Sequence, residues 1–169
     1  METSAKLHSL SYRDAKTYLF AGIFIVGNIL LPQLCHLIPQ GGLIWLPIYF
    51  FTLIAAYKFG LQTGLLTAIL SPLVNCLLFG MPPLASLPAI LIKSSLLAIG
   101  AAYAAKLFGK VAILPILLVV LLYQIVGILA EWMILKEFFP ATQDFRIGIP
   151  GLLLQVFGGY LVLKAISKL

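Results

Sequence analysis

Charged side chains are scarce in this chain of 169 residues. Only 9% of the residues are Asp, Glu, Lys or Arg, whereas 62% are hydrophobic and the mean hydropathy is +1.12. A soluble domain carries about a quarter charged residues, enough to cover its surface in water. The composition therefore excludes a cytosolic enzyme, a nucleic-acid-binding protein and a disordered regulator, and it indicates a membrane protein.

The sequence also lacks the motifs of enzymes and metal sites. It contains no P-loop, no G-x-S-x-G, no H-E-x-x-H and no dinucleotide-binding glycine pattern. Cys35 and Cys76 have no CxxC spacing, and lone cysteines usually pack as small hydrophobic residues. We therefore predict a protein that is not an enzyme and holds no metal or cofactor. If it moves a solute uphill, the energy must come from a gradient or from another subunit.

Long stretches without charge divide the chain into membrane crossings. Residues 17–57 and 59–92 contain no Asp, Glu, Lys or Arg, and each stretch is too long for one crossing of about 20 residues. Turn-rich sequences at 39–42 and 80–83 interrupt these two stretches. Six helices are expected, near residues 17–37, 43–58, 61–79, 84–105, 111–135 and 148–166.

The basic residues predict how these helices are oriented. If both termini lie on one side, that side holds eight of the eleven Lys and Arg residues, namely Lys6, Arg13, Lys16, Lys58, Lys106, Lys110, Lys164 and Lys168. The positive-inside rule places this side in the cytoplasm. The predicted fold is an all-α membrane protein with a cytoplasmic N-terminal tail (1–16), six transmembrane helices in one bundle (17–169) and both termini cytoplasmic.

Lys93 and Glu131 are the only full charges well inside the expected crossings, and both fall in the outer half of the membrane. Because an isolated charge in the bilayer is costly, the two side chains are expected to face the bundle interior. Two interpretations remain open. The residues form a fixed ion pair that locks the fourth helix to the fifth, or one or both contact a polar ligand.

Several other polar or amphipathic side chains occur at the same level. They are Asn75, Gln124, Gln155, His36 and Trp45. Taken singly, amides bridge helices and Trp residues anchor a helix at the membrane interface. Together with Lys93 and Glu131 they predict an outward-facing pocket that is mostly apolar with a few polar groups, as small-molecule sites are.

A stripe of small residues, Gly60, Gly64 and Ala68, lies on the inner half of the third expected helix. Small residues at this spacing let two helices approach closely. The contact could be within the chain, which is the default, or with a partner subunit.

Four short sequences between residues 39 and 106 form a recognisable series: PQGGLIWLP, FGLQTGLLTAILSP, NCLLFGMPP and AIGAAYAAK. In this order, and with six expected helices, they resemble the substrate-binding S components of energy-coupling factor (ECF) vitamin importers. The alanine motif of that family on the first helix is not present.

The resemblance implies a membrane-embedded subunit that captures a vitamin or its precursor outside a prokaryotic cell. It also implies partners, a membrane T component and two ATPase subunits, and no nucleic acid. The gating loops would be formed by Pro39, Gln40, Gly41, Gly42, Gly80, Met81 and Pro82. The small-residue stripe would contact a partner. The alternative is a multipass scaffold or assembly subunit of cell-envelope machinery, which needs no pocket.

Overall fold

The computed structural model of the chain describes residues 3–4, 7 and 9–168, and most of them are helical. Four helices are long and apolar enough to cross a membrane: α1 (Ala15–Cys35), α4 (Leu61–Phe79), α5 (Leu87–Phe108) and α6 (Ile113–Leu135). Two further apolar helical stretches, Pro47–Phe59 and Ile149–Ala165, are shorter. A mostly helical fold is thus confirmed, with four helices long and apolar enough to span a membrane.

The shorter stretches are built from several elements each. The first joins η1 (Pro47–Tyr49) to α3 (Phe50–Phe59), and the second joins α9 (Ile149–Leu153), the π-helical segment η2 (Leu154–Gly158) and α10 (Gly159–Ala165). The other elements are α2 (Gly41–Trp45), α7 (Phe138–Ala141), α8 (Gln143–Arg146) and the antiparallel pair β1 (Thr3–Ser4) and β2 (Lys110–Val111).

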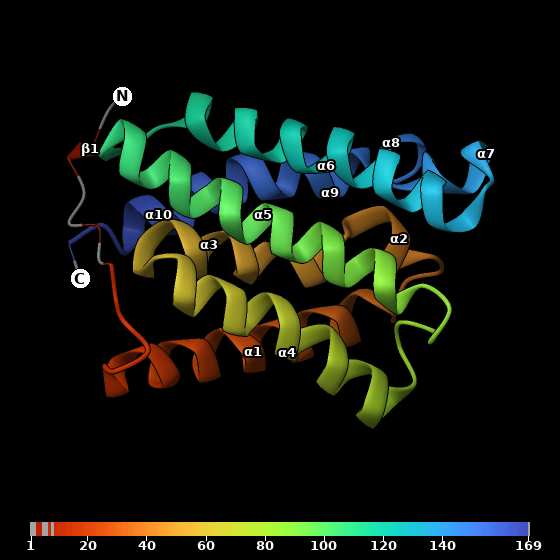
Figure 1. Cartoon of the computed structure of the whole chain (residues 1–169), viewed down its shortest axis with the longest axis horizontal. Helices are drawn as coiled ribbons and strands as arrows, with labels where there is room; N and C mark the ends of the chain where they lie inside the picture. Colours follow the sequence, from red (N-terminus) through yellow and green to blue (C-terminus); the bar gives the residue numbers. More distant parts are fainter. Residues whose placement is uncertain (1–2, 5–6, 8, 169) are drawn as a thin grey trace.

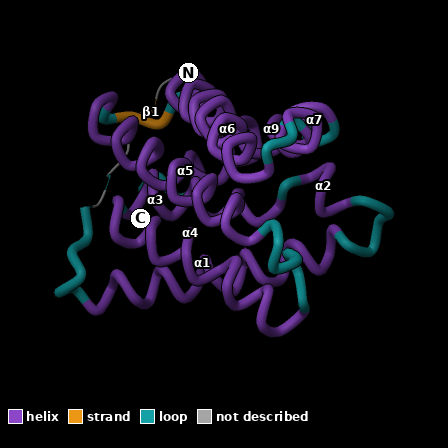
Figure 2. The backbone as a smooth tube through the Cα atoms, turned by 45° about the vertical axis from the view of Figure 1, so that its right-hand side comes forward, coloured by secondary structure: helices purple, strands orange, loops and turns teal. Residues whose placement is uncertain are grey.

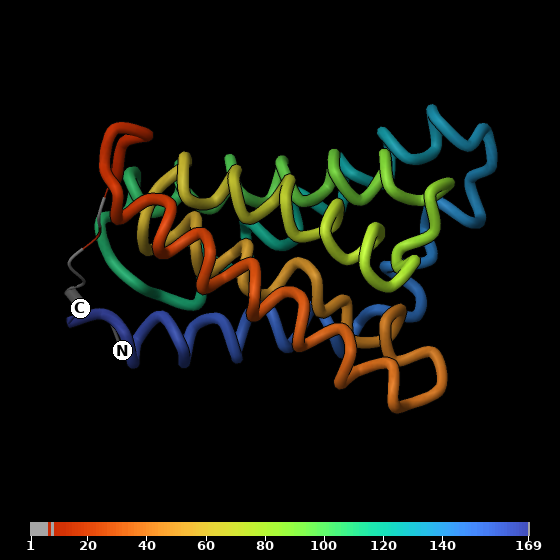
Figure 3. Tube along the Cα trace, turned by 90° about the horizontal axis from the view of Figure 1, so that it is seen from below, coloured from red at the N-terminus to blue at the C-terminus, as the bar shows by residue number. Residues whose placement is uncertain are grey.

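The long helices lie side by side along the long axis of the molecule (Figure 1). Helices α1 and α4 run in the same direction, with α3 returning between them, and α4, α5 and α6 alternate in direction. The start of α1 and the end of α10 lie at the same end of the bundle, which we call the terminal end (Figure 3). The opposite end, here the loop end, carries the segments 36–46, 80–86 and 136–148 (Figure 2). Three connections that are distant in sequence therefore meet at the loop end.

Helix α3 occupies the centre of the bundle and packs against α1, α4, α5 and α10. Every residue of α3 except Phe51 is buried. The stretch Pro47–Phe59 is about 20 Å long at 1.5 Å per residue, which is less than the roughly 30 Å of a hydrocarbon core. It can be short because it is surrounded by other helices of the protein rather than by lipid, so its length need not match the thickness of the bilayer.

One expected helix needs correction. The sequence predicts a continuous helix over 43–58, but the structure breaks it at Leu46, which has a left-handed backbone (φ 45°) and is followed by Pro47. Proline cannot continue the preceding helix, because it has no N–H to donate. By contrast, α4 has the predicted boundaries of 61–79, and glycines with positive φ, Gly60 and Gly80, flank it.

Lys58 lies at the terminal end, on the side where the sequence predicts it, but its side chain does not face outward. The structure buries it completely at the end of α3. Its Nζ donates to the carbonyl of Ser167 at 3.1 Å, which ties α3 to the last residues of the chain. The other basic residues assigned to this side lie at the terminal end, except Lys6, which is outside the described residues.

The small-residue stripe is used for packing within the chain. A Cβ atom added at Gly64 would overlap the Cβ of Ala56 in α3 and lie 2.7 Å from its Cα. Ala68 is fully buried in the core, and Gly60 forms the turn between α3 and α4. This face of α4 is occupied by α3, so the predicted partner contact at Gly64 and Ala68 is replaced by an internal one.

Substituting Gly64 tests how closely α3 and α4 must approach. We expect Gly64→Leu to lower the free energy of unfolding by about 1–3 kcal/mol, since the new side chain forces the two backbones apart. Thermal unfolding of the purified protein in detergent measures the change. Gly22→Leu is the matched control, because a Cβ at Gly22 meets nothing within 4 Å. Equal melting temperatures for the two variants would contradict the packing described here.

Candidate functional site

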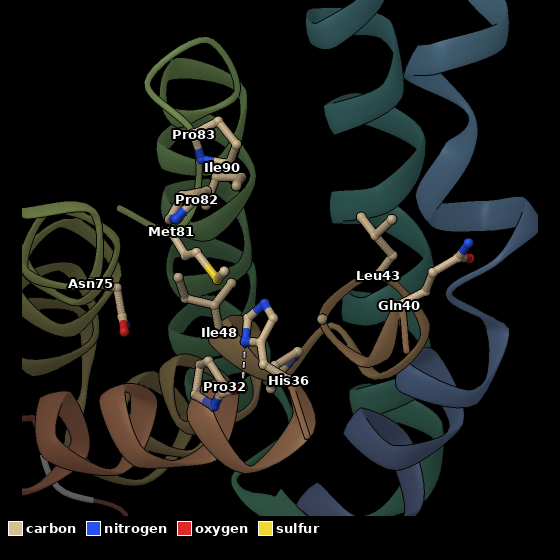
Figure 4. A pocket seen from close by; sticks show the side chains of 12 residues that line it. Pro32, His36, Gln40, Leu43, Ile48, Asn75, Met81, Pro82, Pro83 and Ile90 are labelled. Atoms are coloured by element: carbon tan, nitrogen blue, oxygen red, sulfur yellow. Dashed lines mark hydrogen bonds between the residues drawn. The ribbon is translucent and has the colours of Figure 1, made fainter. Parts of the chain in front are cut away.

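A cavity of about 420 Å³ lies at the loop end, between α1, η1, α4 and α5 (Figure 4). Both predicted gating segments contribute to its wall, with Gln40 and Gly42 from one and Met81 and Pro82 from the other. The remaining lining residues are Pro32, His36, Leu43, Pro47, Ile48, Asn75, Pro83 and Ile90. Two segments separated by about 40 residues therefore converge on one mostly apolar chamber.

Not every predicted gating residue reaches this chamber. Pro39 is exposed, and Gly41 packs closely against the carbonyl group of Cys35 at the end of α1. Gly80 ends α4 with a left-handed backbone (φ 65°) and has open space around it. These three residues shape the turns that carry the lining residues.

A second cavity of about 160 Å³ adjoins the first, and the two share six wall residues. The shared wall consists of Gly42, Leu43, Ile48, Pro82, Pro83 and Ile90. The second cavity reaches deeper toward α6 and α8, where Lys93, Glu131 and Asp144 line it. Apolar and charged compartments are therefore neighbours at the loop end.

Lys93 lies at the centre of a three-residue charged cluster. Its side chain is 2% exposed, and its Nζ forms an ion pair with Glu131 of α6 and another, at 2.7 Å, with Oδ2 of Asp144 in α8. A Cβ at Gly127 of α6 would lie 2.6 Å from Cγ of Lys93, so this glycine makes room for the lysine stem. The predicted pairing of Lys93 with Glu131 is present, and a second carboxylate joins it.

Asp144 is a site residue that the sequence did not reveal. The nearby Arg146 does not pair with it and instead stacks on Phe139, with its guanidinium carbon 3.6 Å from the ring centroid. The short helices α7 and α8 fold back so that Asp144 reaches Lys93. No periodicity in the 136–148 connection predicts this fold-back.

Beside the first cavity, a buried amide network joins α1, α3 and α4. Asn28 is fully buried, and its Nδ2 donates to Thr52 Oγ1 at 3.1 Å and to Ser71 Oγ at 3.2 Å. Its Oδ1 accepts from the backbone N–H of Phe51 at 3.2 Å. Asn28 was not singled out by sequence, although an Asn in a charge-free apolar helix is itself the signal that could have identified it.

Asn75 belongs to the same network and also lines the first cavity. Its Nδ2 donates to the carbonyls of Asn28 at 2.9 Å and Ser71 at 3.1 Å. Its Oδ1 is buried and has no hydrogen-bond partner among the described residues. Since a flipped amide would place oxygen against two carbonyl oxygens, the network fixes Oδ1 as the free acceptor.

His36 is on the wall of the first cavity, as Figure 4 shows. Its Nδ1 lies 2.6 Å from the carbonyl oxygen of Pro32, so Nδ1 must carry the proton. In the neutral ring, Nε2 is then a hydrogen-bond acceptor. This tautomer adds a second acceptor to the same chamber.

Three predicted site residues lie outside both cavities. Gln124 and Gln155 are fully buried and are joined by Tyr123, whose hydroxyl accepts from Gln124 at 3.1 Å and donates to Gln155 at 2.9 Å. Trp45 ends α2, where Gly151 of α9 allows its backbone to approach closely. These residues connect α2, α6, η2 and α9 behind the cavities.

Comparisons of the chain with protein-family models, with curated proteins and with solved structures returned no match.

Proposed function

We propose that the chain is the substrate-binding S component of an ECF-type importer in the cytoplasmic membrane of a prokaryote. In this proposal all six apolar helical stretches cross the bilayer, and both termini are cytoplasmic. The loop end faces outward and captures a vitamin or vitamin precursor. A membrane T component with two ATPase subunits then supplies the energy for its delivery into the cell.

The observation that carries the proposal is the chamber of about 420 Å³ at the loop end. Its volume falls within the range of about 300–1,000 Å³ that small-molecule sites occupy. Residues from the two segments expected to gate such a site, Gln40 with Gly42 and Met81 with Pro82, form part of its wall. A scaffold protein has no need for a chamber of this size.

The distribution of charge supports the orientation. The described basic residues of the termini and of the 109–112 connection lie at the terminal end, opposite the chamber. Of the described basic residues, only Lys136 and Arg146 lie at the loop end outside the buried cluster. Under the positive-inside rule, the basic end is cytoplasmic and the chamber opens outward.

Thermal-shift screening of the purified protein against a panel of vitamins and precursors tests the binding function. We expect one compound to raise the melting temperature by several degrees, since a ligand that binds only the folded state stabilises it. Leu43→Trp should abolish this rise by filling the chamber, because Leu43 lines both cavities. Leu77→Trp, 83% exposed at the end of α4 and outside both cavities, is the matched control.

The outcomes separate the importer from a scaffold. Stabilisation by one compound in the wild type and in Leu77→Trp, but not in Leu43→Trp, supports the importer. No stabilisation by any compound in the wild type would count against a binding function and favour the scaffold. If a ligand is found, its uptake by cells should require the partner ATPases.

A further inference from the structure

We propose that the ligand of this pocket is a cation with hydrogen-bond donors, such as a protonated amine, and that Glu131 and Asp144 bind its positive charge. The inference rests on the proposed binding function and adds the chemical class of the ligand. It depends on three features: the charge balance of the cluster, the exposure of its members and the polarity of the remaining wall groups.

The cluster has one positive and two negative side chains, and its formal charge is therefore −1. Among the described residues that line the two cavities, no other Lys, Arg, Asp or Glu is present. The nearby Arg146 is held over Phe139. An excess negative charge next to an apolar chamber is costly unless a cation compensates it, because the surroundings screen it poorly.

The exposures of the three side chains show which of them a ligand can reach. Lys93 is 2% exposed, whereas Glu131 is 18% and Asp144 is 16% exposed. An anionic ligand would have to displace a carboxylate from Lys93 before it could bind the ammonium group. A cationic ligand can bind the carboxylates from the cavity side and leave both ion pairs in place.

The unpartnered groups of the first cavity point to the same class of ligand independently of the cluster. Asn75 is 1% exposed, and its Oδ1 is held as an acceptor by the two bonds of its Nδ2. In neutral His36, Nε2 is also an acceptor, because Nδ1 faces the Pro32 carbonyl. The buried Asn75 Oδ1 favours a ligand with a donor, since a buried acceptor without a donor is unfavourable. His36 is exposed, so its Nε2 can accept from the ligand or from water.

The volumes and linings of the two cavities indicate which part of such a ligand each cavity binds. The smaller cavity, about 160 Å³, holds the carboxylates, and the larger one, about 420 Å³, is walled mainly by Pro, Leu and Ile side chains. The cationic group fits the smaller, second cavity, and an apolar or aromatic body fits the larger, first cavity. A small heterocyclic amine has this chemistry.

The test sorts the vitamin panel by charge at pH 7. The cations are pyridoxamine, which carries a protonated amine, and thiamine, choline and 1-methylnicotinamide, whose charged nitrogen has no hydrogen. The neutral compounds are nicotinamide and riboflavin, and the anions are biotin, pantothenate and nicotinate. Native mass spectrometry of the full chain, purified from cells, identifies any compound that remains bound. We expect the compound that stabilises or copurifies with the protein to be a cation.

The outcomes distinguish this inference from the proposed function. A cationic hit supports both. A neutral or anionic hit overturns the inference and leaves the binding function intact. A chain that purifies empty and is stabilised by no compound overturns the proposed function, and the inference with it.

Two variants locate the charge that binds a cationic hit. Glu131→Gln and Asp144→Asn should each weaken its binding about tenfold or more, because each removes one charge-assisted contact. Glu137→Gln is the matched control, since it makes the same change at an exposed position of the loop end outside both cavities. Wild-type affinity in both site variants, with unchanged circular dichroism, would overturn the assignment of Glu131 and Asp144.

Discussion

Replacing Lys93 by Met is expected to lower the free energy of unfolding by about 3 kcal/mol. The substitution leaves Glu131 and Asp144 close together without the ammonium group that both contact. Removing one member of a buried ion pair typically costs about 3–5 kcal/mol. We expect the lower end of this range, because the carboxylates are 18% and 16% exposed and retain some contact with water.

Unfolding in mixed detergent micelles measures this loss, and the triple variant Lys93→Met, Glu131→Gln, Asp144→Asn controls for lost packing. With all three charges removed, no carboxylate is left unpaired, so we expect most of the stability to return. A single variant as stable as the wild type would show that the cluster contributes no net stability. A triple variant as unstable as the single one would assign the loss to the lysine stem packed at Gly127.

The same variant bears on the two interpretations of Lys93 that the sequence left open. The structure makes Lys93 a structural link between α5, α6 and α8, and it leaves the carboxylates as the more exposed members of the cluster. The two interpretations therefore apply to different members of one cluster. Lys93 fixes the carboxylates in position, and the carboxylates are the groups that we infer to bind a cationic ligand.

Much of the helical architecture was predictable because the bilayer limits where charge and turns can occur. Charge-free stretches and Pro/Gly turns located the connections at 39–42 and 80–83, and α4 was predicted to the residue. The break at Leu46 was missed because hydropathy does not change there. The helix breaks because Leu46 has a left-handed backbone immediately before Pro47. The separate helix α2 that results packs against α9.

The candidate site was predictable in part for the same reason. Lys93 and Glu131 are conspicuous in apolar helices, and their similar depth follows from the helical rise. Asp144 lies in a polar connection where a carboxylate is ordinary, so only the fold-back of α7 and α8 brings it to Lys93. Gln124 and Gln155 lie outside the cavities, because their side chains face Tyr123 between α6 and η2.

Asn28→Ala is also expected to have a large effect and to lower the free energy of unfolding by about 2–4 kcal/mol. The variant leaves the backbone N–H of Phe51 without its acceptor in the first turn of α3. It also removes the donor to Thr52 and Ser71, while each buried group left unpaired costs about 1–3 kcal/mol. Val26→Ala, on the same helix but 53% exposed, is the matched control and should change stability by less than about 1 kcal/mol.

This variant also separates the polar groups that hold the fold from those that face the ligand. The bond from Asn75 to residue 28 uses the backbone carbonyl, which alanine retains, and the bond to the Ser71 carbonyl is untouched. Asn75 Oδ1 should therefore keep its position, and ligand affinity measured below the melting temperature should stay within a few-fold of wild type. Asn75→Ala should show the reverse pattern, with a larger loss of affinity than of stability. If Asn28→Ala lost affinity as strongly as Asn75→Ala, the two amides would form one functional unit, and the distinction drawn here between packing and binding would be wrong.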